Sequence, residues 1–184
     1  ITMSVAGNNI MQAGDSTIQY QLTTEGAVKV KTLNSLYGSA AGGLAMRRLM
    51  TDPRTQLFES ELNKVSARAI NTEALVTNAL SSSGQAAGTF PATSIGKQLQ
   101  MVARMIAARG ALGQRRQIFY VQHGGYDFHD NLLSSHATKM QELSDAMAAF
   151  YQATAAQGVA NNVTTFTASE FGRALQHNGR GSDH

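Results

Sequence analysis

The chain has 184 residues, of which 42% are hydrophobic, and its 15 Lys and Arg residues against 12 Asp and Glu residues give a formal net charge of +3. This length and apolar content suit one globular domain with a sizeable core and argue against disorder. The mild, scattered basic charge without interleaved aromatic residues does not support a nucleic-acid partner, and no apolar run approaches the ~18 residues of a membrane span. The absence of cysteine excludes disulfides and thiolate zinc sites.

Residues 1–32 are typical of short strands. The stretches ITMSV and IQYQL are rich in β-formers, and AVKVK alternates apolar and polar residues as a half-buried strand does. The segment GNNIMQAGD between the first two is typical of a loop. We therefore expect a small β segment at the N-terminus.

The middle of the chain is predicted to be rich in helices from Leu33 onward. Asp52 followed by Pro53 is a typical helix start, with Asp as the N-cap and Pro at the first helical position. The helix that follows should end near SSSG, and a second helix should end at Gly110. The first helix is expected to bury one apolar face, made of Phe58, Leu62, Val65, Ala69, Val76 and Leu80, and the second to bury Leu99, Val102, Ala103 and Ile106.

The last third of the chain predicts a βαβ unit. QIFYVQ (117–122) and NVTTFTA (162–168) are short β-rich runs, and a helix of about residues 134–157 lies between them. Such a unit places its two strands as parallel neighbours joined by a right-handed crossover. Ligands in these sheets bind beyond the carboxyl ends of the strands, where GGYDFHDN follows the first run and SEFGR and GSDH follow the second. The fold class predicted is α/β.

Two Asp/His clusters in these segments are candidate metal ligands. Asp127 and His129 stand two residues apart, and Asp183 and His184 are adjacent. Carboxylate oxygen with imidazole nitrogen suits zinc, manganese or iron better than calcium. The alternative is that Asp127 caps a turn and His129 is an ordinary surface residue.

Three other polar residues are candidates for substrate binding or for support of the metal ligands. Glu170 and Arg173 flank Gly172, and the guanidinium fork could hold a tetrahedral oxyanion; an ordinary ion pair between the two is the alternative. His136 near the start of the long helix could support the metal ligands or simply pack on the helix face. Motifs of nucleotide-binding loops and of the hydrolase nucleophile elbow are absent from the sequence.

The chain resembles a bacterial family through several motifs taken together. They are GGYDFH at Gly124–His129, His136 opening the next helix, SEFGR at Ser169–Arg173 and GSDH at Gly181–His184, with SVAGNNIMQAGD and IGKQLQMVARMI earlier in the chain. The family resembled is the domain of unknown function numbered 1501, described as alkaline-phosphatase/sulfatase-like. The resemblance covers nearly the whole chain.

This resemblance implies a partial alkaline-phosphatase-like sheet, with residues 1–184 forming one incomplete domain whose upstream and downstream segments lie outside the chain. It implies divalent metal ions, with Asp127 and His129 on one ion and Asp183 and His184 on a second, and a nucleophile from an upstream segment. The function implied is hydrolysis of a small phosphate or sulfate ester. The alternative is a non-catalytic member that binds an anionic ligand or a partner protein.

The same family resemblance implies export to the periplasm or the cell surface. Because it leaves each ion with only two protein ligands and no nucleophile, we expect the chain by itself to bind metal weakly and to lack esterase activity. The Asp-x-His spacing is tighter than the Asp-x-x-x-His of many phosphatases.

Overall fold

The computed structural model describes residues 1–15, 17, 19–84 and 86–184, and within them the fold is α/β. A four-stranded sheet in the order β3-β2-β1-β4 is made of β1 (Thr2–Ser4), β2 (Tyr20–Thr23), β3 (Gly26–Ala27) and β4 (Ile118–Tyr120). β1 runs parallel to both β2 and β4, and β2 pairs with β3 as an antiparallel hairpin. The small N-terminal β segment is thus confirmed for ITMSV and for most of IQYQL, although Ile18 lies outside the described residues.

β1 is an interior strand with a parallel neighbour on each side, and all three of its residues are buried. Met3 is paired with Tyr20 on one side and with Phe119 on the other. The amide of Gln12 donates to the carbonyls of Met3 (2.9 Å) and Ile118 (3.3 Å), which ties the loop after β1 to the end of the sheet. Strands distant in the sequence are therefore joined at the centre of the molecule.

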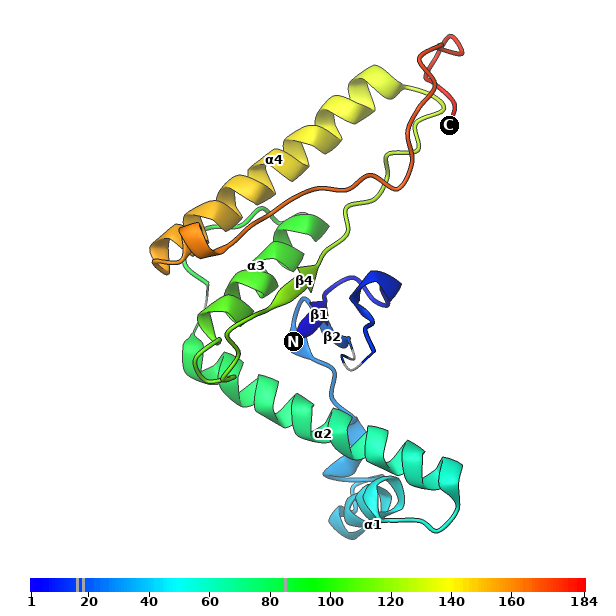
Figure 1. Cartoon of the computed structure of the whole chain (residues 1–184), viewed down its shortest axis with the longest axis vertical. Coiled ribbons are helices and arrows are strands. Elements are labelled where there is room, and N and C mark those ends of the chain that lie inside the picture. Colours follow the sequence, from blue (N-terminus) through cyan, green and yellow to red (C-terminus); the bar gives the residue numbers. More distant parts are fainter. Residues whose placement is uncertain (16, 18, 85) are drawn as a thin grey trace.

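The helices of the described residues are α1 (Ala40–Thr51), α2 (Leu57–Ser83), α3 (Ser94–Ala107) and α4 (Leu132–Ala156). Short 3-10 turns occur at Ile10–Gln12, Lys31–Leu33 and Ala160–Asn162. Ser39 and Thr93 cap α1 and α3, each hydroxyl accepting a backbone N–H of the first turn. α3 and α4 pack side by side, whereas α1 and the start of α2 form the opposite end of an elongated molecule (Figure 1).

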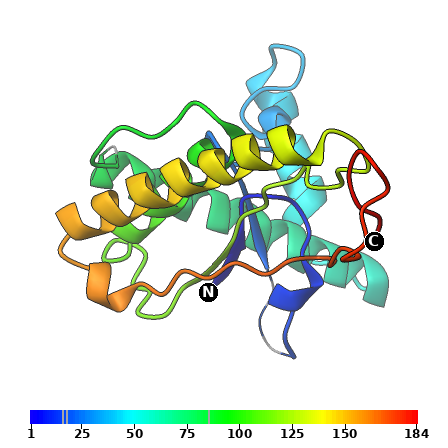
Figure 2. The same ribbon diagram turned by 90° about the horizontal axis from the view of Figure 1, so that it is seen from above.

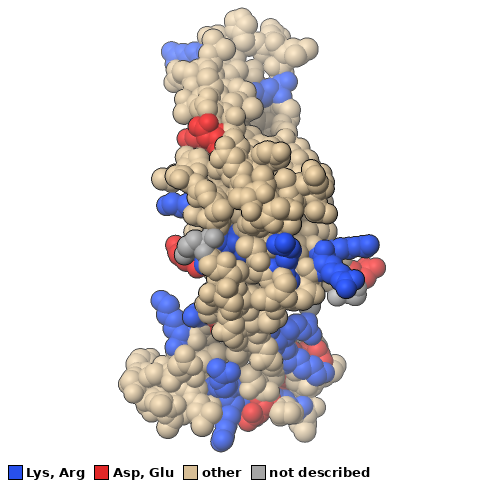
Figure 3. All heavy atoms as spheres, turned by 90° about the vertical axis from the view of Figure 1, so that its left-hand side faces the viewer, with Lys and Arg blue, Asp and Glu red and all other residues tan. Residues whose placement is uncertain are grey.

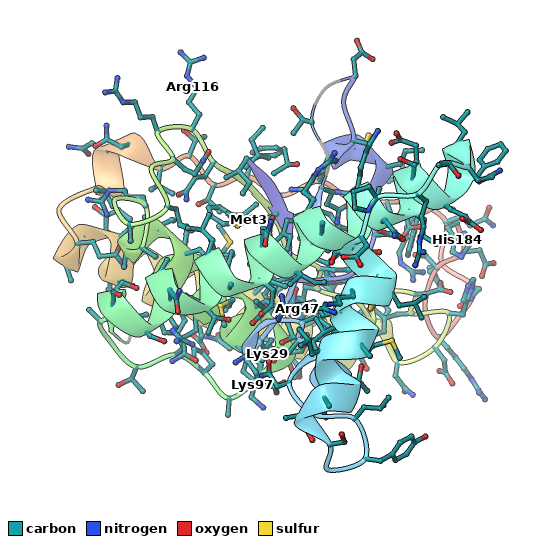
Figure 4. The ribbon with its side chains drawn as sticks, turned by 90° about the horizontal axis from the view of Figure 1, so that it is seen from below. Met3, Lys29, Arg47, Lys97, Arg116 and His184 are labelled. Carbon is teal, nitrogen blue, oxygen red and sulfur yellow. The ribbon has the colours of Figure 1, made fainter. Side chains whose placement is uncertain are left out.

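The core lies between the sheet, α3 and the facing sides of α2 and α4. Burial is most complete on α3, as its predicted apolar face requires. The core includes Met3 and Leu22 of the sheet, Val76 and Leu80 of α2, Ile95, Leu99, Met101, Val102, Ala103, Met105 and Ile106 of α3, and Ala146, Phe150 and Ala153 of α4. Met3 lies in the interior, whereas His184 lies towards one edge of the molecule (Figure 4).

The start of α2 differs from the prediction. Asp52 does not open this helix; it ends α1, and its backbone N–H donates to the carbonyl of Arg48 (2.8 Å). α2 begins at Leu57 and is capped by Gln56. The buried side chain of Asn63 donates to the carbonyl of Asp52 (2.5 Å), so the Asp-Pro pair forms a corner between two helices that a contact from the next helix holds in place.

The predicted apolar face of α2 is buried along only part of its length. Val76 and Leu80 are in the core, but Phe58 is 78% exposed, and Leu62 and Val65 are exposed too. These side chains stay exposed because the N-terminal half of α2 extends beyond the sheet (Figure 1). It packs on α1 through the face that carries the buried Asn63, which donates to the carbonyl of Leu49. AVKVK likewise pairs only at Ala27, and its valines are exposed. The second predicted helix ends at Ala107, before Gly110.

The predicted pairing of strands 117–122 and 162–168 is wrong. In the described residues, 163–169 contains no strand, and the parallel neighbour of β4 is β1. The predicted helix between the two runs is present as α4, with bounds shifted by one or two residues. After α4 the chain turns and runs back along it (Figures 1 and 2). Val163 is partly buried against the core, but residues 164–168, including Phe166, are exposed, so little apolar burial draws this segment into the sheet.

The distribution of charge agrees with the scattered pattern of the sequence. Figure 3 shows Lys and Arg side chains spread along one face with Asp and Glu among them, and more basic side chains towards the end formed by α1 and α2. None of the helices described here has both the length and the apolar character needed to cross a membrane.

Candidate metal centre

The segment that leaves β4 carries the first pair of candidate ligands. It passes Gly125 with a positive φ of 85° and reaches Asp127 and His129 before α4 begins at Leu132. Asn131 adopts a left-handed conformation (φ 53°) that turns the chain into this helix. Asp127 and His129 therefore lie at the N-terminal end of α4.

The last residues of the chain return to the same place. A tight hairpin forms where the backbone N–H of Asn178 donates to the carbonyl of Gly181 (3.0 Å) and His177 bridges to Ser182. The backbone N–H of Leu132, at the start of α4, donates to the carbonyl of Arg180 (3.3 Å). Gly181 is needed at this contact, because a Cβ there would lie 2.6 Å from the carbonyl oxygen of Phe128.

Arg173 holds the two segments together. Its guanidinium donates to the carbonyls of Tyr126 (2.7 Å) and Phe128 (2.9 Å) in the first segment and to that of Ser182 in the second. The side chain is only 18% exposed. Its planar fork thus satisfies three backbone acceptors from two parts of the chain.

Asp127 is the meeting point of the candidate ligands. Its Oδ1 lies 2.9 Å from Nε2 of His129, 3.2 Å from Nε2 of His184 and 3.3 Å from Nη2 of Arg173. Asp127, His129 and His184 each offer one ligand atom, and these three atoms lie within 4.8 Å of one another. One carboxylate and two imidazoles therefore share a single centre.

Asp183 lies on the opposite side of the His129 ring. Its Oδ1 is 2.9 Å from Nδ1 of His129 and accepts a hydrogen bond from the amide of Asn178 (3.2 Å). The hydrogen bond with His129, followed by that from Asn178, lowers the pKa of Asp183 below its ordinary value. The charged Asp183 accepts a hydrogen bond from Nδ1 of His129, while Nε2 of the same ring faces Asp127.

The centre is open to solvent. The side chains of Asp127, His129, Asp183 and His184 are between 42% and 64% exposed. Two shallow grooves of about 420 and 390 Å³ lie elsewhere, along α4 beside Pro91. The metal-capable groups are thus on the surface, and their arrangement depends on contacts with one another and with Arg173 and Asn178.

The remaining candidates from the sequence lie near the cluster but outside it. His136 is exposed, and its ring packs near the rings of Tyr126 (6.1 Å) and Phe128 (6.3 Å). In the described residues Arg173 forms its ion pair with Asp127 and not with Glu170. Glu170 is exposed. The guanidinium that the sequence offers for an oxyanion is occupied here by backbone carbonyls.

One contributor to the cluster, Asn178, was not predicted from the sequence. Asn178 donates to both Asp183 and the carbonyl of His129 (3.1 Å). The Asn-Gly-x-Gly spacing of residues 178–181 was the available signal, because Asn followed by glycines is typical of a tight turn. Such a turn just before Asp183 folds the end of the chain back on itself.

Together these features define an α/β protein with an exposed Asp/His cluster formed by two loop segments beside α4. Residues 21–184 match the family model described as Protein of unknown function (DUF1501), and the chain belongs to this family. No curated protein and no solved structure matches the chain.

Proposed function

We propose that this chain supplies the divalent-metal centre of a hydrolase that acts on phosphate or sulfate esters. The observation that supports it is the convergence of Asp127, His129 and His184 within 4.8 Å, with Asp183 behind His129. The ester substrate class rests on the resemblance to alkaline-phosphatase-like and sulfatase-like proteins. The same resemblance supports a periplasmic or cell-surface location for the protein.

The geometry favours one centre over the two separate pairs expected from the resemblance. Asp127, His129 and His184 would hold the ion. Asp183 would accept the Nδ1 proton of His129 and so orient its ring, as carboxylates commonly do for metal-binding histidines. Three protein ligands are the usual set of a catalytic zinc site, and two nitrogens with one oxygen suit zinc, with manganese or iron as alternatives.

The exposed side of the cluster leaves room for an anionic ester. An ion held there would supply Lewis-acid polarisation of an ester oxygen. Arg173 keeps the loop of Asp127 and the loop of His184 in one arrangement through its three carbonyl contacts. Its charge beside Asp127 also adds positive potential where an anion would approach.

One observation supports the alternative of a non-catalytic binder. In the described part of the chain, the side-chain contacts of the four Asp and His residues are with one another, with Arg173, with Asn178 and with the ring of Phe171, and they include no hydroxyl nucleophile. A centre of this kind could bind an anionic ligand or a partner protein without turnover.

Metal titration of the purified chain tests the centre. We expect one zinc ion per chain by calorimetry, loss of binding in Asp127→Ala, and binding weakened roughly 10- to 100-fold in Asp183→Asn, because the carboxylate that orients His129 is lost. Asp130→Ala is the matched control, since Asp130 lies close by but pairs with Arg180. Two ions per chain would contradict the single centre, and equal binding by Asp127→Ala would contradict the ligand set.

Activity assays on an aryl phosphate and an aryl sulfate separate the two functions. Turnover by the metal-loaded chain that disappears in Asp127→Ala would support the hydrolase. For this chain alone we expect metal-dependent binding of phosphate or sulfate without turnover under either function, because the nucleophile expected from the resemblance belongs to an upstream segment. Absence of turnover from a protein that includes that segment would support the non-catalytic binder.

A further inference from the structure

A second polar network lies beneath the first ligand loop. The side chain of His123 is only 9% exposed, and both ring nitrogens have partners. Nδ1 lies 2.8 Å from the hydroxyl of Tyr126, and Nε2 lies 3.0 Å from a carboxylate oxygen of Glu142 on α4. Lys139 donates to the same oxygen of Glu142 at 3.0 Å.

The partners determine which way the hydrogen bonds run. Glu142 can only accept, so Nε2 of His123 donates to it and Nδ1 accepts the proton of the Tyr126 hydroxyl. The hydrogen bond from Lys139, and then that from His123, lowers the pKa of Glu142, so its carboxylate stays charged.

The network restrains the loop immediately before Asp127. Tyr126 is held at its phenol by His123 and at its carbonyl by Arg173 (2.7 Å). Gly125, with its positive φ, lies under the Lys139 side chain, whose Cε is 3.2 Å from the position a Cβ would take. Two anchors on one residue limit where the next residue, Asp127, can place its carboxylate.

We propose that His123, Tyr126 and Glu142 are positioning residues that couple α4 to Asp127 and thereby set the affinity of the metal centre. This inference rests on the proposed function, since the centre must bind an ion for affinity to be set. The three residues do not contact the ion site; they act through the backbone of residues 123–127. An experiment on this proposal therefore changes the hydrogen bonds that anchor residues 123–127 and leaves the metal ligands as they are.

The test removes one hydrogen bond without changing the packing. Tyr126→Phe deletes only the hydroxyl group that donates a hydrogen bond to Nδ1 of His123. Tyr151→Phe, which makes the same change on the exposed face of α4, is the matched control. Two measurements are made on each protein: Co²⁺ affinity with its visible absorption spectrum, and amide hydrogen exchange of residues 124–129 without metal. Circular dichroism establishes that each variant is folded.

We expect Tyr126→Phe to bind Co²⁺ roughly 10-fold more weakly, with an altered spectrum, and to exchange faster at residues 124–129. Tyr151→Phe should match the wild type in both measurements. Glu142→Gln, which keeps an acceptor for His123, should lose less affinity than Glu142→Ala.

Unchanged exchange in Tyr126→Phe would overturn the anchor. Faster exchange with unchanged Co²⁺ affinity and spectrum would overturn its role in metal binding. A wild-type chain that binds no Co²⁺ would refute the proposed function and, with it, the role in affinity, while the exchange data would still decide whether Tyr126 anchors the loop.

Discussion

The layer formed by α3 and α4 and the segment of residues 163–184 are held in place by different forces. In the helical layer, Met101, Met105 and Ala153 are almost completely buried, and the helices keep their shape through apolar packing. In the described residues, segment 163–184 contains no helix or strand, and its large apolar side chains Phe166 and Leu175 are exposed.

The polar contacts of the segment compensate for its lack of burial. Arg173 donates to carbonyls of both segments, and Asn178 ties the turn to His129 and Asp183. Apolar packing in the layer of α3 and α4 thus contributes most to the stability of the fold, whereas polar contacts of residues 163–184 determine the geometry of the Asp/His cluster. The two regions should therefore respond to different substitutions.

The largest expected effect is a loss of stability without a loss of metal affinity. Met101→Ala removes a side chain that is 1% exposed, and the cavity should lower the free energy of unfolding by about 2–5 kcal/mol. Urea unfolding measures this loss, and Met140→Ala on exposed α4 surface is the control. Metal affinity, measured well below the unfolding transition, should stay within about twofold, since distant sites act independently. A parallel fall in affinity would show that core and centre are coupled.

The opposite result is expected at Gly181. A methyl group there would meet backbone atoms of Phe128 and His129 at 2.6–2.8 Å, so Gly181→Ala must move the two ligand segments apart. We expect metal affinity to fall on the order of 10- to 100-fold, comparable with the loss of a supporting contact. The free energy of unfolding should change by less than about 1 kcal/mol, because the segment buries little apolar surface.

Gly172→Ala is the control for this substitution, since no atom lies within 4 Å of the Cβ it would add. It should bind metal as the wild type does. Equal affinities for Gly181→Ala and the wild type would show that the close approach of the two segments does not matter for binding.

The smallest effect joins the two regions through Glu142 and depends on pH. Its pKa is lowered chiefly by the hydrogen bond from Lys139. A carboxylate with a lowered folded-state pKa contributes stability that is fully present above its unfolded pKa of about 4.3 and is lost as the pH falls through the folded value. Glu142→Gln should therefore melt below the wild type near neutral pH, and the difference should shrink in acid.

Thermal melts at about pH 7, 5 and 3 measure this dependence. Glu61→Gln, which removes an exposed pair with Lys64, should change the melting temperature little at each pH. A difference between Glu142→Gln and the wild type that is independent of pH would contradict the role of the Glu142 charge.

Periodicity predicted the helices well where the core covers them. α3 and α4 lie close to their expected bounds, and the end of α2 at Ser83 agrees with the expected stop at SSSG. The prediction failed where the same apolar pattern extends past the core, as at Phe58. Apolar spacing defines a face of a helix, but burial depends on whether another element reaches that face.

The candidate ligands were identifiable from the sequence, but the route by which they meet was not. The clusters were expected to converge at the ends of two neighbouring strands; the structure brings them together through a loop and a terminal hairpin. NVTTFTA has the composition of a strand, yet β4 pairs with β1 instead. The role of Asp127, His129, Asp183 and His184 as metal ligands stays a prediction.

The sequence by itself determined what depends on neighbours in the chain: the helices α3 and α4, the end of α2 near Ser83 and the list of candidate Asp and His residues. Only the tertiary structure decided that Arg173 binds carbonyls of Tyr126 and Phe128, and that Asp183 orients His129 while His184 meets Asp127. The physical reason is that every residue has a backbone carbonyl, so an acceptor of this kind leaves no mark in the sequence. Contacts between segments some fifty residues apart also depend on where packing places each segment, which local preferences do not specify.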